Sequence, residues 1–198
     1  RQDVLWLIMA GYFGPILAGH NEAFQKTFDP QQIEILDTIA RAIIHALKSG
    51  HKVLLCGNGG SGTDALHIAA EFVGRFEIER VSLPAIALTA DTAAITAIGN
   101  DYGYDRVFER QVEGLGQKGD VLIALSTSGK SPNVLKAIAA AKQKGILTVG
   151  FTGRDGGAMA GEADHLFLVR SQKTTHIQEM HMIALHGICE VVEQILFG

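Results

Sequence analysis

The chain has 198 residues, of which 47% are hydrophobic and 19% are charged, and its formal net charge is −4 at neutral pH. This composition excludes general disorder and suits one globular domain with a full core. The lack of a net positive charge argues against direct binding of nucleic acid. The two cysteines, Cys56 and Cys189, are too few for a disulfide framework, and a protein without one is expected in the reducing cytoplasm.

The first segment, from Val4 to Ala18, is apolar and uncharged. It is too short to cross a bilayer comfortably, two glycines and a proline interrupt it, and Asp3 does not suit the basic start of a signal peptide. We therefore expect residues 1–28 to form a helical arm that is buried or packed at an interface, rather than a membrane segment.

Strands and helices are expected to alternate along residues 29–198. A helix begins at Pro30 and ends at Ser49-Gly50. Apolar runs typical of buried strands occupy residues 53–56, 84–88, 120–125, 147–151 and 165–169. Further helices are expected from the first glycine turn to about residue 74, and at 89–98, 104–115, 132–144 and 175–196. This pattern predicts an α/β fold, a doubly wound parallel five-stranded sheet with N-terminal helices.

Two turns at strand ends are suited to an anion. The first, Cys56-Gly57-Asn58-Gly59-Gly60-Ser61, bends tightly beside a helix N-terminus, whose free N–H groups and dipole favour a phosphate. The second, Ser126-Thr127-Ser128-Gly129-Lys130-Ser131, offers four hydroxyls before the helix that begins at Pro132. One serine-rich turn is more often a capped helix, but two at matching strand ends indicate a sugar phosphate. Neither turn has Walker or dinucleotide-binding spacing, which disfavours ATP and NAD.

Two helices carry metal-binding side chains at helical spacing. His67 and Glu71 are four residues apart on one face of the helix after the first turn. Gln178 and His186 are eight residues apart and share a face of the last helix with His181 or Met182. A lone histidine on such a face is usually structural, and glutamine is an unusual zinc ligand. Together, however, His67, Glu71, Gln178 and His186 would complete a four-ligand zinc shell.

This ordered set of motifs resembles the sugar isomerase (SIS) domain family. The resemblance covers residues 29–198 and rests on the two turns, on His67-x3-Glu71, on Gly99-Asn100-Asp101 and on Ile177-Gln178-Glu179-x-His181 with His186. Within the family it is similar to the phosphoheptose isomerases, which begin ADP-heptose synthesis for lipopolysaccharide. The resemblance implies a flavodoxin-like sandwich. It also implies the interconversion of sedoheptulose 7-phosphate and D-glycero-D-manno-heptose 7-phosphate through an enediol.

The resemblance also implies roles for individual residues. Residues that would hold the substrate are Asn58, Gly59, Gly60, Ser61, Glu71, Asn100, Asp101, Ser126, Thr127, Ser128, Ser131 and Gln178. One Zn2+ per subunit would be bound by His67, Glu71, Gln178 and His186. Glu71 and His186 would be the catalytic pair. The family is typically a homotetramer with active sites between subunits, and two departures from its usual residues, Lys130 and Thr175, would affect sugar preference.

A non-catalytic relative provides the alternative. Residues 76–88 and 177–182 resemble an SIS protein that binds the replication initiator DnaA as a tetrameric scaffold. That scaffold lacks the carboxylate at the position of Glu71 and the histidine at the position of His186, and this chain has both. We therefore expect the isomerase, without nucleic acid or membrane partners, and DnaA only under the alternative. An isomerase of another sugar phosphate is the third possibility.

Overall fold

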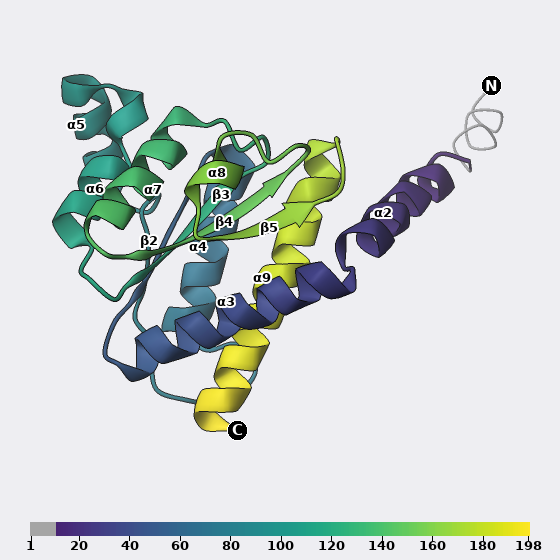
Figure 1. Ribbon diagram of the computed structural model, residues 1–198, viewed down its shortest axis with the longest axis horizontal. Helices are drawn as coiled ribbons and strands as arrows, with labels where there is room; N and C mark the ends of the chain where they lie inside the picture. The colour runs from purple at the N-terminus through teal and green to yellow at the C-terminus, as the bar shows by residue number, and fades with distance from the viewer. Residues whose placement is uncertain (1–10) are drawn as a thin grey trace, which may run out of the picture.

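A computed structural model describes residues 11–198, and the start of the expected arm, residues 1–10, lies outside this range. Five strands form one sheet in the order β2-β1-β3-β4-β5 (Figure 1). They are β1 Val53–Gly57, β2 Ala85–Ala87, β3 Val121–Ser126, β4 Leu147–Gly153 and β5 His165–Val169. Every neighbouring pair is parallel, so the predicted fold class is confirmed.

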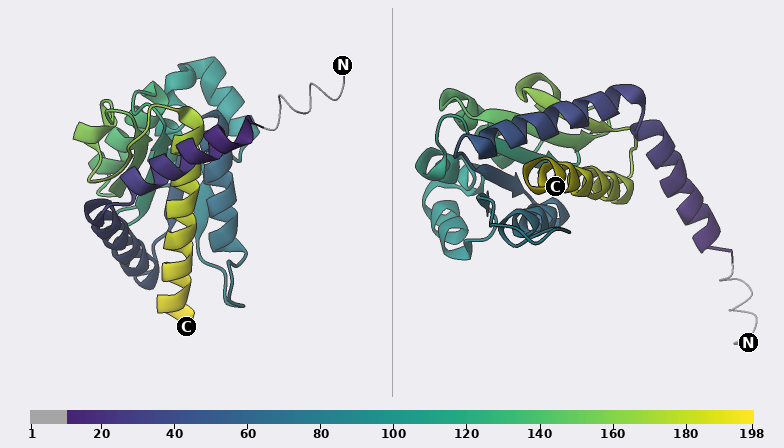
Figure 2. Two further views of the ribbon diagram at one scale, coloured as in Figure 1. Left: turned by 90° about the vertical axis from the view of Figure 1, so that its right-hand side faces the viewer. Right: turned by 90° about the horizontal axis from the view of Figure 1, so that it is seen from below.

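Helices cover both faces of the sheet. One face carries α3 Pro30–Lys48, α4 Gly59–Val73 and α9 Thr174–Phe197. Figure 2 shows α9 between the other two, with which it makes extensive contact. The second face carries α5 Thr92–Tyr102, the 3-10 helix η1 Tyr104–Arg106, α6 Glu109–Leu115, α7 Pro132–Gln143 and α8 Met159–Glu162.

The alternation of side chains along each strand produces two separate cores. In β1, Val53 and Leu55 face α3, α4 and α9, whereas Leu54 and Cys56 face the second layer of helices. All four are fully buried, which explains why the strands are continuous apolar runs. Burial raises the pKa of the Cys56 thiol to about 12, so this residue is a neutral core side chain.

Some predicted boundaries are wrong on the second face. The helix expected to end at Ile98 continues to Tyr102, so Asn100 and Asp101 lie in its last turn rather than in a loop. Gly103, with φ of 89°, ends it instead. The single helix expected at 104–115 is divided into η1 and α6. Helix α8 was not predicted, because four residues are too few to show a period.

Helix α2, Phe13–Thr27, is the described part of the expected arm and extends away from the sheet (Figures 1 and 2). Its last turns are anchored, because Ala23 and Thr27 are buried and Thr27 Oγ1 accepts a hydrogen bond of 3.1 Å from Arg170 N. The first half was expected to be buried or at an interface. Tyr12, just before the helix, and Phe13, Ile16 and Leu17 within it are exposed, so they are not buried by this chain itself and their packing at an interface stays a prediction.

Among the described helices, α9 alone is long and apolar enough to cross a membrane by length and composition. It is also the central helix of its layer, and Ile177, Leu185 and Val192 on its inner face are fully buried. A helix that contacts a sheet and two neighbouring helices is expected to be apolar around much of its surface. Its place in the core therefore accounts for its composition.

Candidate active site

The two predicted anion loops lie side by side at the edge of the sheet. Strands β1 and β3 are neighbours, and the chain leaves them in opposite directions, toward β2 and β4. In open parallel sheets, ligands bind outside the carboxyl ends of the strands at such a switch point. Strand β1 continues into α4 through Asn58, and β3 continues into α7 through residues 127–131. The topology therefore brings both loops to the same edge of the sheet.

A reciprocal pair of amide side chains joins the two loops. Asn58 Nδ2 donates to Asn133 Oδ1 at 2.9 Å, and Asn133 Nδ2 donates to Asn58 Oδ1 at 2.8 Å. The hydroxyl of Tyr104 also donates to Asn58 Oδ1, at 3.1 Å. Asn133 is only 2% exposed, which is unusual for an amide side chain in the first turn of a helix. Sequence reasoning missed both Asn133 and Tyr104, and neither had a local signal that singled it out.

The serine-rich loop after β3 is held closed by its own atoms. Ser126 Oγ and Ser131 Oγ lie 2.9 Å apart, and Gly129 N donates to Ser126 O at 3.0 Å. Gly129 has φ of 63°, and a Cβ there would collide with the carbonyl of Gly156. Thr127 and Ser128 are half-buried at the rim of the loop. The loop is thus a tight turn in which the hydroxyls of Ser126 and Ser131 lie together.

The glycines of the first turn allow close contacts that a side chain would prevent. A Cβ on Gly57 would lie 2.5 Å from the carbonyl oxygen of Ser61, which is buried in the first turn of α4. A Cβ on Gly60 would collide with the side-chain amide of Gln178. Gly59, with φ of 53°, is exposed beside them. The start of α4 is therefore in contact with the start of α9.

Helices α4 and α9 both begin at the carboxyl edge of the sheet and run in the same direction (Figure 2). Gly60 meets Gln178 at this edge. About two turns further along, His67 meets His186, with ring centroids 5.0 Å apart. Seven residues of α4 and eight of α9 separate these two contacts, which is about 10 and 12 Å along the helix axes. The contacts therefore follow one seam between the helices.

Three side chains direct their ligand atoms toward one another on this seam. His67 Nε2 lies 3.0 Å from Glu71 Oε1 and 3.5 Å from His186 Nε2. All three atoms lie within 4.8 Å of one another. Two imidazole nitrogens and one carboxylate oxygen form a donor set that suits Zn2+. The structure thus brings three of the four predicted ligands together, whereas Gln178 contacts Gly60 at the start of the seam.

Comparison with known proteins identifies the family. A model of the SIS domain family matches residues 20–153. One curated relative is the phosphoheptose isomerase of Bradyrhizobium sp. (strain ORS 278), which is 56% identical over 160 residues, a match that covers 81% of each chain. A second is the phosphoheptose isomerase of Aliarcobacter butzleri (strain RM4018), which is 52% identical over 174 residues, a match that covers 88% of this chain and 92% of the relative. The solved phosphoheptose isomerase of Neisseria gonorrhoeae is 40% identical, with a TM-score of 0.89, and the match covers 94% of this chain and 99% of that one. This chain belongs to the phosphoheptose isomerases of the SIS domain family.

Two further residues that the resemblance linked to the phosphoheptose isomerase substrate, Asn100 and Asp101, are exposed at the end of α5. Asn100 Nδ2 donates to Asp101 Oδ1 at 2.8 Å. The side-chain hydrogen bond from this part of the chain to the glycine turn comes from Tyr104 instead. Tyr104 therefore connects this part of the chain to the glycine turn.

His181 is distinct from the site histidines of this phosphoheptose isomerase family member. It is fully buried, its Nε2 donates to the carbonyl of Thr152 at 3.1 Å, and its ring packs edge-on against Phe151. Burial lowers the pKa of His181 to about 4, so the ring is neutral. Of the two histidines considered for the helical face, His186 faces α4 and His181 belongs to the core.

Proposed function

We propose that this chain interconverts sedoheptulose 7-phosphate and D-glycero-D-manno-heptose 7-phosphate. The observation that carries the proposal is the convergence of Glu71, His67 and His186 on a seam that begins at the glycine turn, which Asn58 and Asn133 connect to the start of α7 after the serine-rich loop. An aldose–ketose isomerase needs a base, an acid and a phosphate site in one crevice. The family supports the sugar class, since its members named above are phosphoheptose isomerases.

The phosphate end of the substrate would bind where the two loops meet. Hydroxyls of the loop after β3 and the N-terminus of α4 would donate hydrogen bonds to the phosphate oxygens. The residues in this role are Ser61, Ser126, Thr127, Ser128 and Ser131. The sugar would contact Asn58, Gly59, Gly60, Asn100, Asp101 and Gln178. The amide pair of Asn58 and Asn133 would keep the two loops at the separation that the phosphate requires.

The proton transfer would use the two groups that face each other across the seam. Glu71 would take the proton from C1 of the ketose as O2 gains one, which gives the enediol. His186 would then give its proton to C2 as O1 loses one, and proton exchange with solvent would return Glu71 and His186 to their starting states. His67, at 3.0 Å from Glu71 and 3.5 Å from His186, would orient both. A carboxylate and an imidazole on adjacent, packed helices need little reorganisation during the reaction.

Zinc is supported by the chemistry of the donor set. His67, Glu71 and His186 would hold the ion, and Gln178, whose amide lies against Gly60 in this structure, would turn toward them as the fourth ligand. When bound, zinc would supply a positive charge that stabilises the developing oxyanion. Because a carboxylate bound to a metal is a weaker base, the activity and the metal content of Glu71 variants have to be measured in the same sample.

Assembly and location complete the proposal. The phosphoheptose isomerase would act in the cytoplasm, as a homotetramer with active sites between subunits, at the start of ADP-heptose synthesis for lipopolysaccharide. Exposure of the site supports an oligomer, since the side chain of His67 is 49% exposed. Large apolar side chains are exposed nearby on the same two helices, at Leu66, Val73, Ile183 and Val191.

The division into an arm, residues 1–28, and an SIS domain, residues 29–198, is also a proposal. Helix α2 ends at Thr27, and Asp29 caps α3 by accepting a hydrogen bond of 2.8 Å from Gln32 N. The arm would then contribute its exposed apolar face to the subunit interface.

The deciding experiment is an assay of the purified chain with sedoheptulose 7-phosphate, in which formation of the aldose is followed with and without a chelator. Turnover that the chelator abolishes and zinc restores supports the reaction and its dependence on zinc. No turnover, together with binding of the initiator DnaA, would instead support the scaffold. Nothing in the site or in the comparisons favours that alternative.

A further inference from the structure

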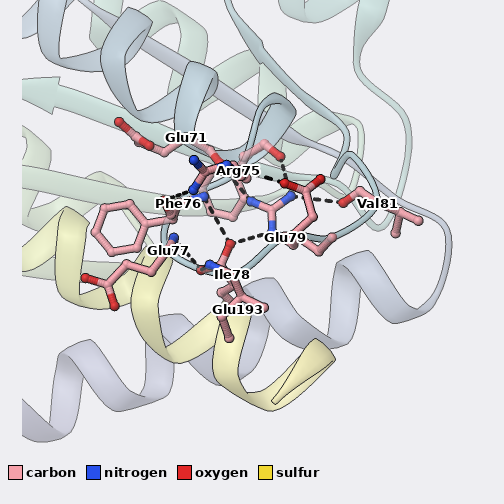
Figure 3. A network of polar contacts seen from close by, with 10 residues as sticks. Glu71, Arg75, Phe76, Glu77, Ile78, Glu79, Val81 and Glu193 are labelled. Carbon is pink, nitrogen blue, oxygen red and sulfur yellow. Dashed lines mark hydrogen bonds and ion pairs between the residues drawn. The ribbon is translucent and has the colours of Figure 1, made fainter.

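A buried carboxylate lies on α9 two turns after His186. Glu193 is 2% exposed, and it accepts hydrogen bonds from three successive backbone N–H groups. Its Oε1 accepts from Phe76 N at 3.0 Å, and its Oε2 accepts from Glu77 N at 2.7 Å and from Ile78 N at 2.8 Å (Figure 3). One side chain of α9 therefore holds the segment that follows α4.

A guanidinium completes the network and extends it to α4. Arg80 Nε donates to Glu193 Oε1 at 2.8 Å, and both side chains are 2% exposed. Its two other nitrogens donate to carbonyl oxygens in the last turn of α4, Nη2 to Glu71 at 2.8 Å and Nη1 to Phe72 at 3.0 Å. The backbone at Glu71 is thus bound to an ion pair anchored on α9.

The segment held by Glu193 also contacts the second member of the acid–base pair. The ring of Phe76 stacks on the imidazole of His186, with centroids 5.7 Å apart and planes inclined by 24°. A stacked ring limits the rotation of an imidazole and keeps water from one of its faces. The backbone N–H of the same Phe76 donates to Glu193, so the residue that stacks on His186 is bound to this carboxylate.

We infer that Glu193 and Arg80 are positioning residues that set the mutual geometry of Glu71 and His186. Their contacts end on the backbone of Glu71 and on the segment whose phenyl ring covers His186. The inference rests on the proposed function, because it assigns a role relative to that reaction. A misplacement of about 1 Å at a reacting group lowers turnover by up to about a hundredfold, so small shifts at either end of this network affect the rate.

The competing interpretation is that the pair only stabilises the fold, and the chain contains a control for it. Asp120 is likewise a buried carboxylate, and it accepts from Lys52 N at 3.0 Å, from Gln117 N at 2.8 Å and from Lys52 Nζ at 2.6 Å. It precedes β3 and so lies at the amino edge of the sheet, opposite the site. Asp120→Asn therefore tests the loss of a buried charge without touching Glu71 or His186.

The experiment compares Glu193→Gln with Asp120→Asn at a temperature at which circular dichroism shows both to be folded. For Glu193→Gln we expect kcat to fall by about ten- to a hundredfold, with KM for the sugar phosphate within about twofold of wild type. Zinc content, measured in the same samples, is expected to stay at the wild-type level. For Asp120→Asn we expect kcat and KM to be unchanged although stability falls.

Phe76→Leu is the second variant, because it removes the ring from His186 without exposing a buried charge. A reduced kcat at wild-type KM and zinc content is expected here too, and it keeps the test valid where Glu193→Gln does not fold. Wild-type kcat in a folded Glu193→Gln, or in Phe76→Leu if Glu193→Gln does not fold, overturns the positioning role alone. Absence of isomerase activity in the wild type overturns the proposed function, and the positioning role with it.

Discussion

Asn58 and Asn133 exchange two side-chain hydrogen bonds, of 2.9 and 2.8 Å, across the carboxyl ends of β1 and β3. Asn58 lies in the first anion loop and Asn133 lies in the first turn of α7, directly after the second, so the two residues are 75 positions apart in the chain. The pair thus links two loops that the sheet alone brings together only at their bases. Because both amides have their donors and acceptors directed at each other, the link depends on both residues.

Removal of this link should weaken substrate binding. In Asn133→Ala the side chain of Asn58 loses its partner, and we expect KM for the sugar phosphate to rise by about tenfold while the unfolding free energy falls by about 1–3 kcal/mol. Steady-state kinetics and urea unfolding measure the two effects. Gln143→Ala, at the exposed end of the same helix, is the control. An unchanged KM in folded Asn133→Ala would show that the link does not shape the phosphate site.

Metal binding is expected to depend on His67. Elemental analysis of the wild type should find about one zinc per subunit, and His67→Ala should lose it, because its Nε2 is central to the donor set. His45→Ala removes an exposed histidine on α3 and should keep the zinc. Full zinc occupancy in His67→Ala would place the ion elsewhere.

Turnover is expected to depend on the carboxylate of Glu71. Glutamine keeps its size and hydrogen bonding, so Glu71→Gln should fold, bind inorganic phosphate normally and lose about 10²- to 10⁴-fold in kcat. The control is Glu79→Gln, since that side chain is 91% exposed. Normal activity in a zinc-replete Glu71→Gln protein would mean that another group is the base.

Glu193 is expected to contribute to stability in a pH-dependent way. Burial acts to raise the pKa of Glu193, but hydrogen bonds from Ile78, Phe76, Glu77 and Arg80 outweigh it and lower the pKa to about 2. Because the folded-state pKa lies below the ordinary value of 4.5, the contribution is complete above pH 4.5 and is lost as the pH falls toward 2.

Urea unfolding of the wild type and Glu193→Gln at several pH values checks this expectation. Breaking a buried charge pair costs about 3–5 kcal/mol, so a difference of this order is expected at pH 7 and should shrink below pH 4.5. A difference that stays constant down to pH 2 would mean that Glu193 is not ionised in the folded protein.

The parts of the fold that the sequence predicted are those with a local cause. Buried parallel strands are apolar on both faces, so a continuous apolar run such as residues 120–125 can be recognised as a strand from the sequence. The run Gly99-Asn100-Asp101 led to the wrong end for the preceding helix. Turn-forming residues are tolerated inside a helix when tertiary packing outweighs their low helix propensity. Helical spacing was enough to pair His67 with Glu71. It could not distinguish His181 from His186 on the last helix, and the structure does so because His181 points at the sheet whereas His186 points at α4.

The residues that sequence reasoning missed act between segments far apart in the chain. Asn133, Tyr104 and Glu193 have ordinary positions in their own helices or turns, and their partners lie between 46 and 117 residues away. No periodicity or short motif in the sequence indicates such a contact, because it forms only when the helices pack against the sheet. Their roles therefore became visible only in three dimensions.

The seam between α4 and α9 limits how this protein can change during evolution. One residue inserted between Gln178 and His186 would turn everything after it by about 100° and advance it by about 1.5 Å. Gln178 could then stay beside Gly60, but His186 would no longer face His67. Substitutions on the outer faces of the two helices leave this register intact. A change of length between Gln178 and His186 would therefore break one of the two contacts, so the spacing of eight residues constrains every descendant of this chain that keeps both.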